Sequence, residues 1–266
     1  MDKEASAMAI VTKLGDQAVL RNYCTFAGMH RAVVAETLFR ALGADPNQRR
    51  SIGLEITGNF VAALEDVALW FFVLKEWKME QSLLFDLLDA IQVRESAQSK
   101  YSSLVAQNEL AKWTIADLRR EFGLPTDDEL LKRGWTEMIL TAHINGLRGA
   151  LEILRTALEM RTEDEHVLVS SYNKIKHGAL AIAATEHSPI DVSVMLSSRR
   201  GPLDKASGKR KINTGWMACE GEALRRLVDN TIQVSFALWQ ILNFLYMARF
   251  DPSWKTPPWP YPVSAT

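Results

Sequence analysis

The strongest constraint on the fold is a run of large apolar residues between Asp45 and Leu74, spaced three and four apart. Asp45 is a candidate N-cap and Pro46 suits the first position of a helix, while Gln48 completes a variant of the capping box. Apolar positions at this spacing lie on one face of a helix. The stretch therefore predicts a core-facing helix of about seven turns, with an inward stripe formed by Ile52, Ile56, Phe60, Leu64, Val67, Phe71 and Leu74.

Further helices are indicated by the residues that start and stop them. A long amphipathic stretch over 17–42 ends at Gly43, a suitable residue to follow a helix. Gly123 and Pro125 end another helix, and Thr126 with Glu129 forms a capping box that starts the next one. That helix should run to about Arg161 with Trp135, Ile139, Ala142, Leu147, Leu151 and Leu154 facing inward. The remaining expected helices cover 82–92, 110–121, 171–183 and about 220–249.

Two later segments are not helical in pattern. "PIDVSVML", 189–196, alternates as a strand does, and "RKINTGWM", 210–217, can pair with it. Beyond residue 250 the tail is rich in proline and aromatic residues and favours extended conformations. We therefore predict an all-α fold, an antiparallel helical bundle with a small inserted β-hairpin at about 189–217. Residues 1–122 would pack on a bundle formed by 123–250, and 251–266 would form a Pro/Trp-rich tail.

Composition limits the class of protein. The net charge is −1, so no general excess of positive charge points to nucleic acid. The chain has 2 cysteines, too few for a disulfide framework, and lacks a hydrophobic amino-terminal signal, which favours the cytoplasm. Residues 230–248 are uncharged and could be a buried core helix or a membrane span. Its polar Gln and Asn residues favour the core helix, so no membrane is expected. No motif for a metal or cofactor occurs.

The chemistry-bearing segment is "YNKIKHG", Tyr172–Gly178. It places Asn173, Lys174, Lys176 and His177 within five consecutive positions. One interpretation is a solvated helix face without a functional role, with Ile175 facing inward. The sharper one is a site for an anion, because the amide and the imidazole lie one helical turn apart and two ammonium groups flank them. Another histidine, His143, lies among apolar helix residues and is expected in the core with a local partner, or in the same cleft.

This segment, together with the order of helices from about residue 127 to 250, resembles the HEPN domains, the higher-eukaryote and prokaryote nucleotide-binding family. Many members are metal-independent endoribonucleases of toxin–antitoxin or phage-defence systems. The family motif has an arginine, a polar residue, several further residues and then a histidine. On this resemblance Asn173 matches the polar residue and His177 the catalytic histidine, whereas Tyr172 stands where the arginine is expected. The resemblance also implies a homodimer, and an antitoxin or defence-system protein as a further partner.

A second basic group lies at the tip of the expected β-hairpin and at the start of its second strand. Arg199, Arg200, Lys209, Arg210 and Lys211 surround Gly, Ser and Pro residues there. Such a loop is commonly a solvent-exposed segment without a ligand, but its basic side chains could bind RNA phosphates. We therefore predict a protein that binds or cleaves RNA, with His177 and Asn173 as catalytic candidates and the basic residues as phosphate ligands. The alternative is a non-catalytic nucleotide-binding or protein-interaction module. The tail with Trp254, Trp259 and Tyr261 either packs on its own bundle or binds a partner.

Overall fold

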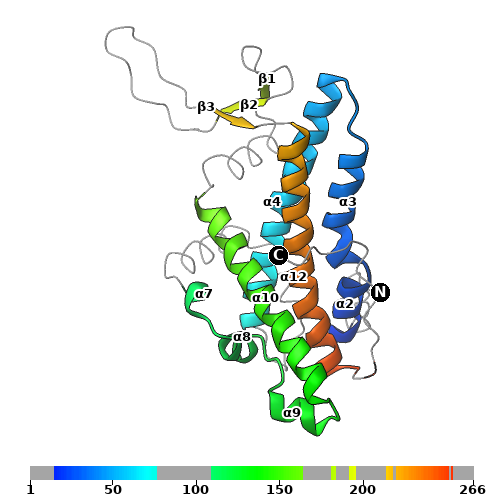
Figure 1. Ribbon diagram of the computed structural model, residues 1–266, viewed down its shortest axis with the longest axis vertical. Coiled ribbons are helices and arrows are strands. Elements are labelled where there is room, and N and C mark those ends of the chain that lie inside the picture. Colours follow the sequence, from blue (N-terminus) through cyan, green and yellow to red (C-terminus); the bar gives the residue numbers. More distant parts are fainter. Residues whose placement is uncertain are drawn as a thin grey trace, which may run out of the picture. The chain divides into compact units, whose positions relative to one another are not determined.

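The computed structural model describes residues 15–76, 109–163, 181–183, 192–195, 214–217, 220–251 and 253. Most of this part is helical, as the sequence predicts (Figure 1). The helices are α2 (Asp16–Asn22), α3 (Gly28–Arg40), α4 (Pro46–Glu76), α7 (Glu109–Lys112), α8 (Ile115–Glu121), α9 (Asp127–Lys132), α10 (Glu137–Glu163) and α12 (Gly221–Arg249), with a π-helical turn η1 (Tyr23–Ala27) that joins α2 to α3.

The chain divides into two compact units. Unit 1 comprises residues 1–30, 64–158 and 233–266, and unit 2 comprises 31–63 and 159–232. The helices α4, α10 and α12 contribute residues to both. The division at residue 122 that the sequence suggests stays a prediction.

The central helix α4 matches the prediction closely. Pro46 is its first residue, and the carboxylate of Asp45 accepts a hydrogen bond from the backbone N–H of Gln48 at 2.8 Å. The whole predicted stripe from Ile52 to Leu74 is buried. The side chain of Gln48, however, reaches back to the carbonyl of Ala41 at 3.5 Å, so it serves the end of α3 and not the capping box.

In unit 1, α4 and α12 form an aromatic core with the helices around them. The ring of Phe71 packs on Trp113 and Phe122 with centroids 5.0 and 5.7 Å away. The buried indole N–H of Trp239 on α12 donates to the carbonyl of Cys24 at 2.8 Å, which ties α12 to η1. Buried aromatic side chains remove much apolar area from water, so these contacts are a main source of stability in this unit.

Helices α10 and α12 run antiparallel in unit 1 (Figure 1). His143 packs on Phe244, and further along α10 a Cβ atom added at Gly146 would lie 2.9 Å from the side chain of Gln240. Residue numbers therefore rise on α10 as they fall on α12. At the far end, Arg133 donates to the carbonyl of Ala248 and so satisfies one of the last carbonyl groups of α12.

Two of the predicted helices are interrupted. The helix expected over 110–121 is divided into α7 and α8, because the hydroxyl of Thr114 and the carboxylate of Asp117 form a capping box that starts a new helix. The helix expected from Thr126 to about Arg161 begins with the predicted Thr126–Glu129 capping box but stops at Lys132. Gly134 has a φ of +89°, which ends α9, and α10 starts afresh at Glu137.

The inward stripe predicted on α10 is partly wrong. Leu147, Leu151 and Leu154 are buried, but Ile139 is 47 % exposed and Ala142 is exposed. Leu140 is buried instead. The new helix start at Glu137 sets the phase of the first turns, so the inward face begins at the residue next to the one expected.

Three short strands lie between α10 and α12 in the sequence: β1 (Ala181–Ala183), β2 (Val192–Met195) and β3 (Thr214–Met217). They pair antiparallel in the order β1-β2-β3, with Ile182 opposite Ser193 and Ser193 opposite Trp216. The helix expected over 171–183 is therefore wrong in its last three residues, since residues 181–183 form backbone pairs with β2. The residues that connect β2 to β3 lie outside the described part, so the predicted β-hairpin insertion stays a prediction.

Candidate functional site

The predicted site lies outside the residues that the structure describes. This holds for Asn173, Lys174, Lys176 and His177, which fall in the sequence between the end of α10 at Glu163 and the start of β1 at Ala181. It holds equally for the basic segment between β2 and β3, with Arg199, Arg200, Lys209, Arg210 and Lys211. Their roles stay predictions.

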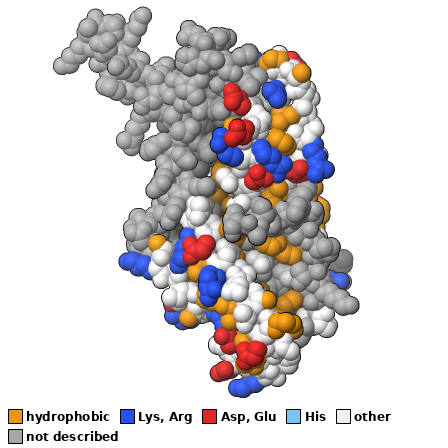
Figure 2. All heavy atoms as spheres, viewed as in Figure 1, with side chains coloured by type: hydrophobic (Ala, Val, Ile, Leu, Met, Phe, Trp, Pro, Cys, Tyr) orange, Lys and Arg blue, Asp and Glu red, His pale blue; other side chains and the backbone are white. Residues whose placement is uncertain are grey.

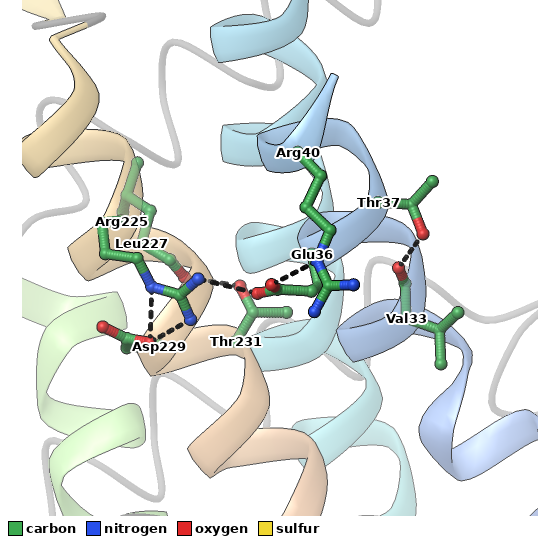
Figure 3. Close-up of polar contacts among 8 residues, drawn as sticks. All are labelled: Val33, Glu36, Thr37, Arg40, Arg225, Leu227, Asp229 and Thr231. Carbon is green, nitrogen blue, oxygen red and sulfur yellow. Dashed lines mark hydrogen bonds and ion pairs between the residues drawn. The ribbon is translucent and has the colours of Figure 1, made fainter. Parts of the chain in front are cut away.

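Within the described part, the most developed polar site is an ion cluster in unit 2 that joins α3 to α12 (Figure 3). We call Glu36, Arg40, Arg225 and Asp229 the Glu36 cluster. The Oε2 atom of Glu36 accepts a hydrogen bond from Arg225 Nη1 at 2.8 Å, and its Oε1 atom accepts one from Arg40 Nε at 2.9 Å. Arg225 Nε also donates to Asp229 Oδ1 at 2.9 Å. Each acidic side chain therefore faces a guanidinium group.

Burial and pairing act on this cluster in opposite directions. The side chain of Glu36 is 10 % exposed, and its burial by itself would raise the pKa of the carboxyl. The hydrogen bonds from Arg40 and Arg225 outweigh burial, so the pKa of Glu36 is lowered. The pKa of Arg225 is raised, first by its hydrogen bond to Asp229 and then by that to Glu36. The guanidinium of Arg225 also lies 5.1 Å from the ring centre of Phe39.

These properties indicate a structural tie and not a reactive site. A carboxylate whose pKa is lowered is a poor proton donor near neutral pH, and both arginines already donate to carboxylates. The four charges cancel, two acidic against two basic. The sequence shows the local pairs Glu36–Arg40 and Arg225–Asp229 through their spacing of four. The contact between Glu36 and Arg225 joins residues 189 positions apart and has no sequence signal.

His143 is the second notable group. Its ring centre lies 3.7 Å from that of Phe244 and 5.4 Å from that of Trp135, both in unit 1. Its Nε2 atom is buried and has no hydrogen-bond partner among the described residues. Burial, with a smaller contribution from the positive charge of Arg119, lowers the pKa of His143 to about 4. The imidazole is therefore neutral at pH 7 and packs against the rings of Trp135 and Phe244, which lie outside its own helix.

The other reactive groups in the described part are unremarkable in their surroundings. The thiol of Cys24 is buried, and burial raises its pKa to about 12, so it is not a nucleophile at neutral pH. Among the described residues, no group of three or more His, Cys, Asp or Glu side chains could hold a metal ion. On the face shown in Figure 2, acidic and basic side chains lie beside one another and do not gather by sign.

Comparison with known proteins adds no relative. No family model, no curated protein and no solved structure matches the chain. Among the helices that the structure describes, none combines the length and apolar character that a membrane crossing requires. For α12 this agrees with the polar residues that its buried face carries, namely Thr231, Ser235 and Asn243.

Proposed function

We propose that this chain binds RNA and cleaves it without a metal ion, as an HEPN-like protein. The observation that carries the proposal is the segment "YNKIKHG", which gathers Asn173, Lys174, Lys176 and His177. Two features are compatible with it. The described part is mostly helical, and the long helices α10 and α12 flank the segment in sequence and run antiparallel.

The proposed reaction uses the RNA's own 2′-hydroxyl group. A base takes the proton of that hydroxyl, the oxygen attacks the adjacent phosphorus, and an acid protonates the departing 5′ oxygen. The products are a 2′,3′-cyclic phosphate and a free 5′-hydroxyl. His177 serves in one of the two proton transfers, because an unperturbed imidazole titrates near neutral pH. Asn173 orients the imidazole or the phosphate, and Lys174 and Lys176 offset the negative charge that develops on the phosphorane.

The basic segment between β2 and β3 would supply most of the affinity. The whole chain has a net charge of −1, so binding to a polyanion must come from a local group. Arg199, Arg200, Lys209, Arg210 and Lys211 form such a group in the sequence. A single chain offers one such histidine segment, so a two-fold homodimer would bring two of them to one cleft.

The decisive experiment is cleavage of total RNA in the presence of EDTA. The wild type should cleave, His177→Ala should lose at least about a hundredfold in rate, and the products should carry cyclic phosphate ends. His30→Ala is the matched control, because His30 is an exposed histidine on α3 and should leave cleavage unchanged. Equal cleavage by the wild type and His177→Ala would refute the catalytic assignment.

Tyr172 favours a second candidate, in which the same segment binds phosphate but does not cleave. A tyrosine cannot supply the positive charge that an arginine brings to the phosphate. In this case the wild type binds labelled RNA in fluorescence anisotropy without cleaving it, and binding weakens when the basic segment is neutralised. Neutralising one basic side chain that binds a phosphate should reduce the slope of log K against log salt concentration by about 0.7. Tyr172→Arg then tests whether the absent positive charge explains the lack of cleavage, since this substitution should raise the cleavage rate if it does.

A further inference from the structure

The start of α10 carries an exposed apolar surface in unit 1. Met138 is 78 % exposed and Ile139 is 47 % exposed, and Trp135, just before the helix, is half-buried. We call Trp135, Met138 and Ile139 the α10 entry patch. Single exposed apolar side chains are ordinary on protein surfaces. Here, two of the large apolar side chains that are exposed in the described part are consecutive, and both lie within the first turn of one helix.

The α10 entry patch lies beside the point where the chain leaves α12. Arg133, two residues before Trp135, donates to the carbonyl of Ala248, and the ring of Trp135 lies 6.0 Å from that of Phe244. After α12 ends at Arg249, the carboxylate of Asp251 accepts hydrogen bonds from the backbone N–H and the hydroxyl of Ser253 at 3.0 and 2.6 Å. These bonds fix a turn at the exit, so the chain enters residues 254–266 from a point near the patch.

The segment that follows has the composition of a ligand for such a surface. Residues 254–266 contain Trp254, Trp259 and Tyr261 among four prolines. In a polyproline conformation, which rises about 3.1 Å per residue, a segment of this length spans about 40 Å. Met138 follows Arg133 by five residues and so lies within about 18 Å of it. The segment is therefore long enough to reach the patch from the end of α12.

We propose that residues 254–266 bind back onto the α10 entry patch, with the tryptophan rings against Met138 and Ile139. Thioether groups make favourable contacts with aromatic rings. A proline-rich segment is already extended and loses little conformational freedom on docking. The charges are also complementary. Lys255 is the only charged residue of the segment, and the exposed, acidic Glu137 lies next to Met138 in α10. This docking is independent of RNA binding.

Methyl NMR of the full chain, labelled at the methionine methyl groups, tests the docking directly. A docked tryptophan should shift the Met138 resonance upfield, and Trp254→Leu with Trp259→Leu should return it to the position of an exposed methionine. Met29 on α3 is the control and should not move. A Met138 resonance that ignores both substitutions overturns the proposal. A shift that disappears on dilution also overturns it, because the occupant would then be a second copy.

Proteolysis provides a second measurement that needs no assignment. Trypsin cleaves after Lys255, and docking should protect this bond. Met138→Gln keeps a good helix former but removes the apolar contact, so the cleavage rate should rise about five- to thirtyfold. Thr156→Gln is the matched control, since Thr156 is exposed on the same helix about 27 Å further along. Equal cleavage rates for the wild type and Met138→Gln would contradict the docking.

Discussion

The Glu36 cluster makes a sharp prediction about stability, tested by Glu36→Gln. The substitution keeps the shape of the side chain but removes the charge that faces Arg225 and Arg40. The bond from Arg40 is worth little, roughly 0.3 kcal/mol, because the side chain of Arg40 is 72 % exposed. The bond from Arg225 is less exposed and joins two ions, so its loss costs about 1.5 kcal/mol. The free energy of unfolding should therefore fall by about 2 kcal/mol.

The assay is urea unfolding followed by circular dichroism, with the change measured from the midpoint at constant slope. Glu222→Gln is the matched control. Glu222 pairs with Arg226 at a spacing of four on α12. The Oε1 atom of Glu222 lies 3.7 Å from Nη1 of Arg226, however, and the two side chains are 85 % and 71 % exposed. Its loss should change the free energy of unfolding by less than about 0.5 kcal/mol. A double-mutant cycle built from Glu36→Gln and Arg225→Met should show a coupling free energy of about 1 kcal/mol between Glu36 and Arg225.

Acid gives an independent test of the same cluster. The pKa of Glu36 is lower in the folded than in the unfolded chain, so the unfolded state binds the proton more readily. The contribution of Glu36 is therefore full above the ordinary glutamate pKa and is lost as the pH falls through the folded pKa. The difference between the wild type and Glu36→Gln should shrink over that range. If Glu36→Gln costs no more than Glu222→Gln, or the difference stays constant in acid, the cluster does not act as reasoned.

Three further predictions concern unit 1. The pKa of His143 is lowered to about 4, so the unfolded state binds its proton at a higher pH than the folded state does. The free energy of unfolding should therefore fall between about pH 6.5 and pH 4, by up to roughly 3 kcal/mol. His143→Phe should remove this part of the pH dependence, measured by urea unfolding at pH 7 and pH 4.5. Gly123 has a φ of +59°, and a Cβ there would meet the guanidinium of Arg249, so Gly123→Ala should cost about 1–2 kcal/mol. Gly149→Ala, where a Cβ meets open space inside a helix, should instead stabilise the chain by about 0.5–1 kcal/mol in thermal unfolding.

Local signals predicted the helical elements because the physics behind them is local. Pro46 and Asp45 start α4, and Thr126 with Glu129 starts α9, through hydrogen bonds that span only three residues. The buried stripe of α4 follows from helical periodicity alone, since one face of a helix that long must leave water. The breaks at Thr114 and Gly134 were missed. The residues that cause them are visible in the sequence, but the apolar pattern on each side suggested one continuous helix.

For the candidate functional residues, the sequence showed the local groups but not the contacts between distant parts of the chain. The segment "YNKIKHG" is visible in the sequence because its polar residues are neighbours, and so is the basic segment after β2. Their function is a proposal that rests on residue chemistry and resemblance. The role of His143 was only half predicted. Its burial followed from its apolar neighbours, whereas the aromatic partners Trp135 and Phe244 come from outside its own helix.

The sequence by itself determined where α4 and α9 begin and which apolar stripe of α4 is buried, because caps and periodicity depend on residues within a few positions of one another. Only the tertiary structure decided that Glu36 is neutralised by Arg225, that His143 is held uncharged between aromatic rings, and that Met138 and Ile139 remain exposed. Each of these depends on which helix packs against which. The free energy of burying or pairing a group is set by neighbours that the chain brings together only when it folds.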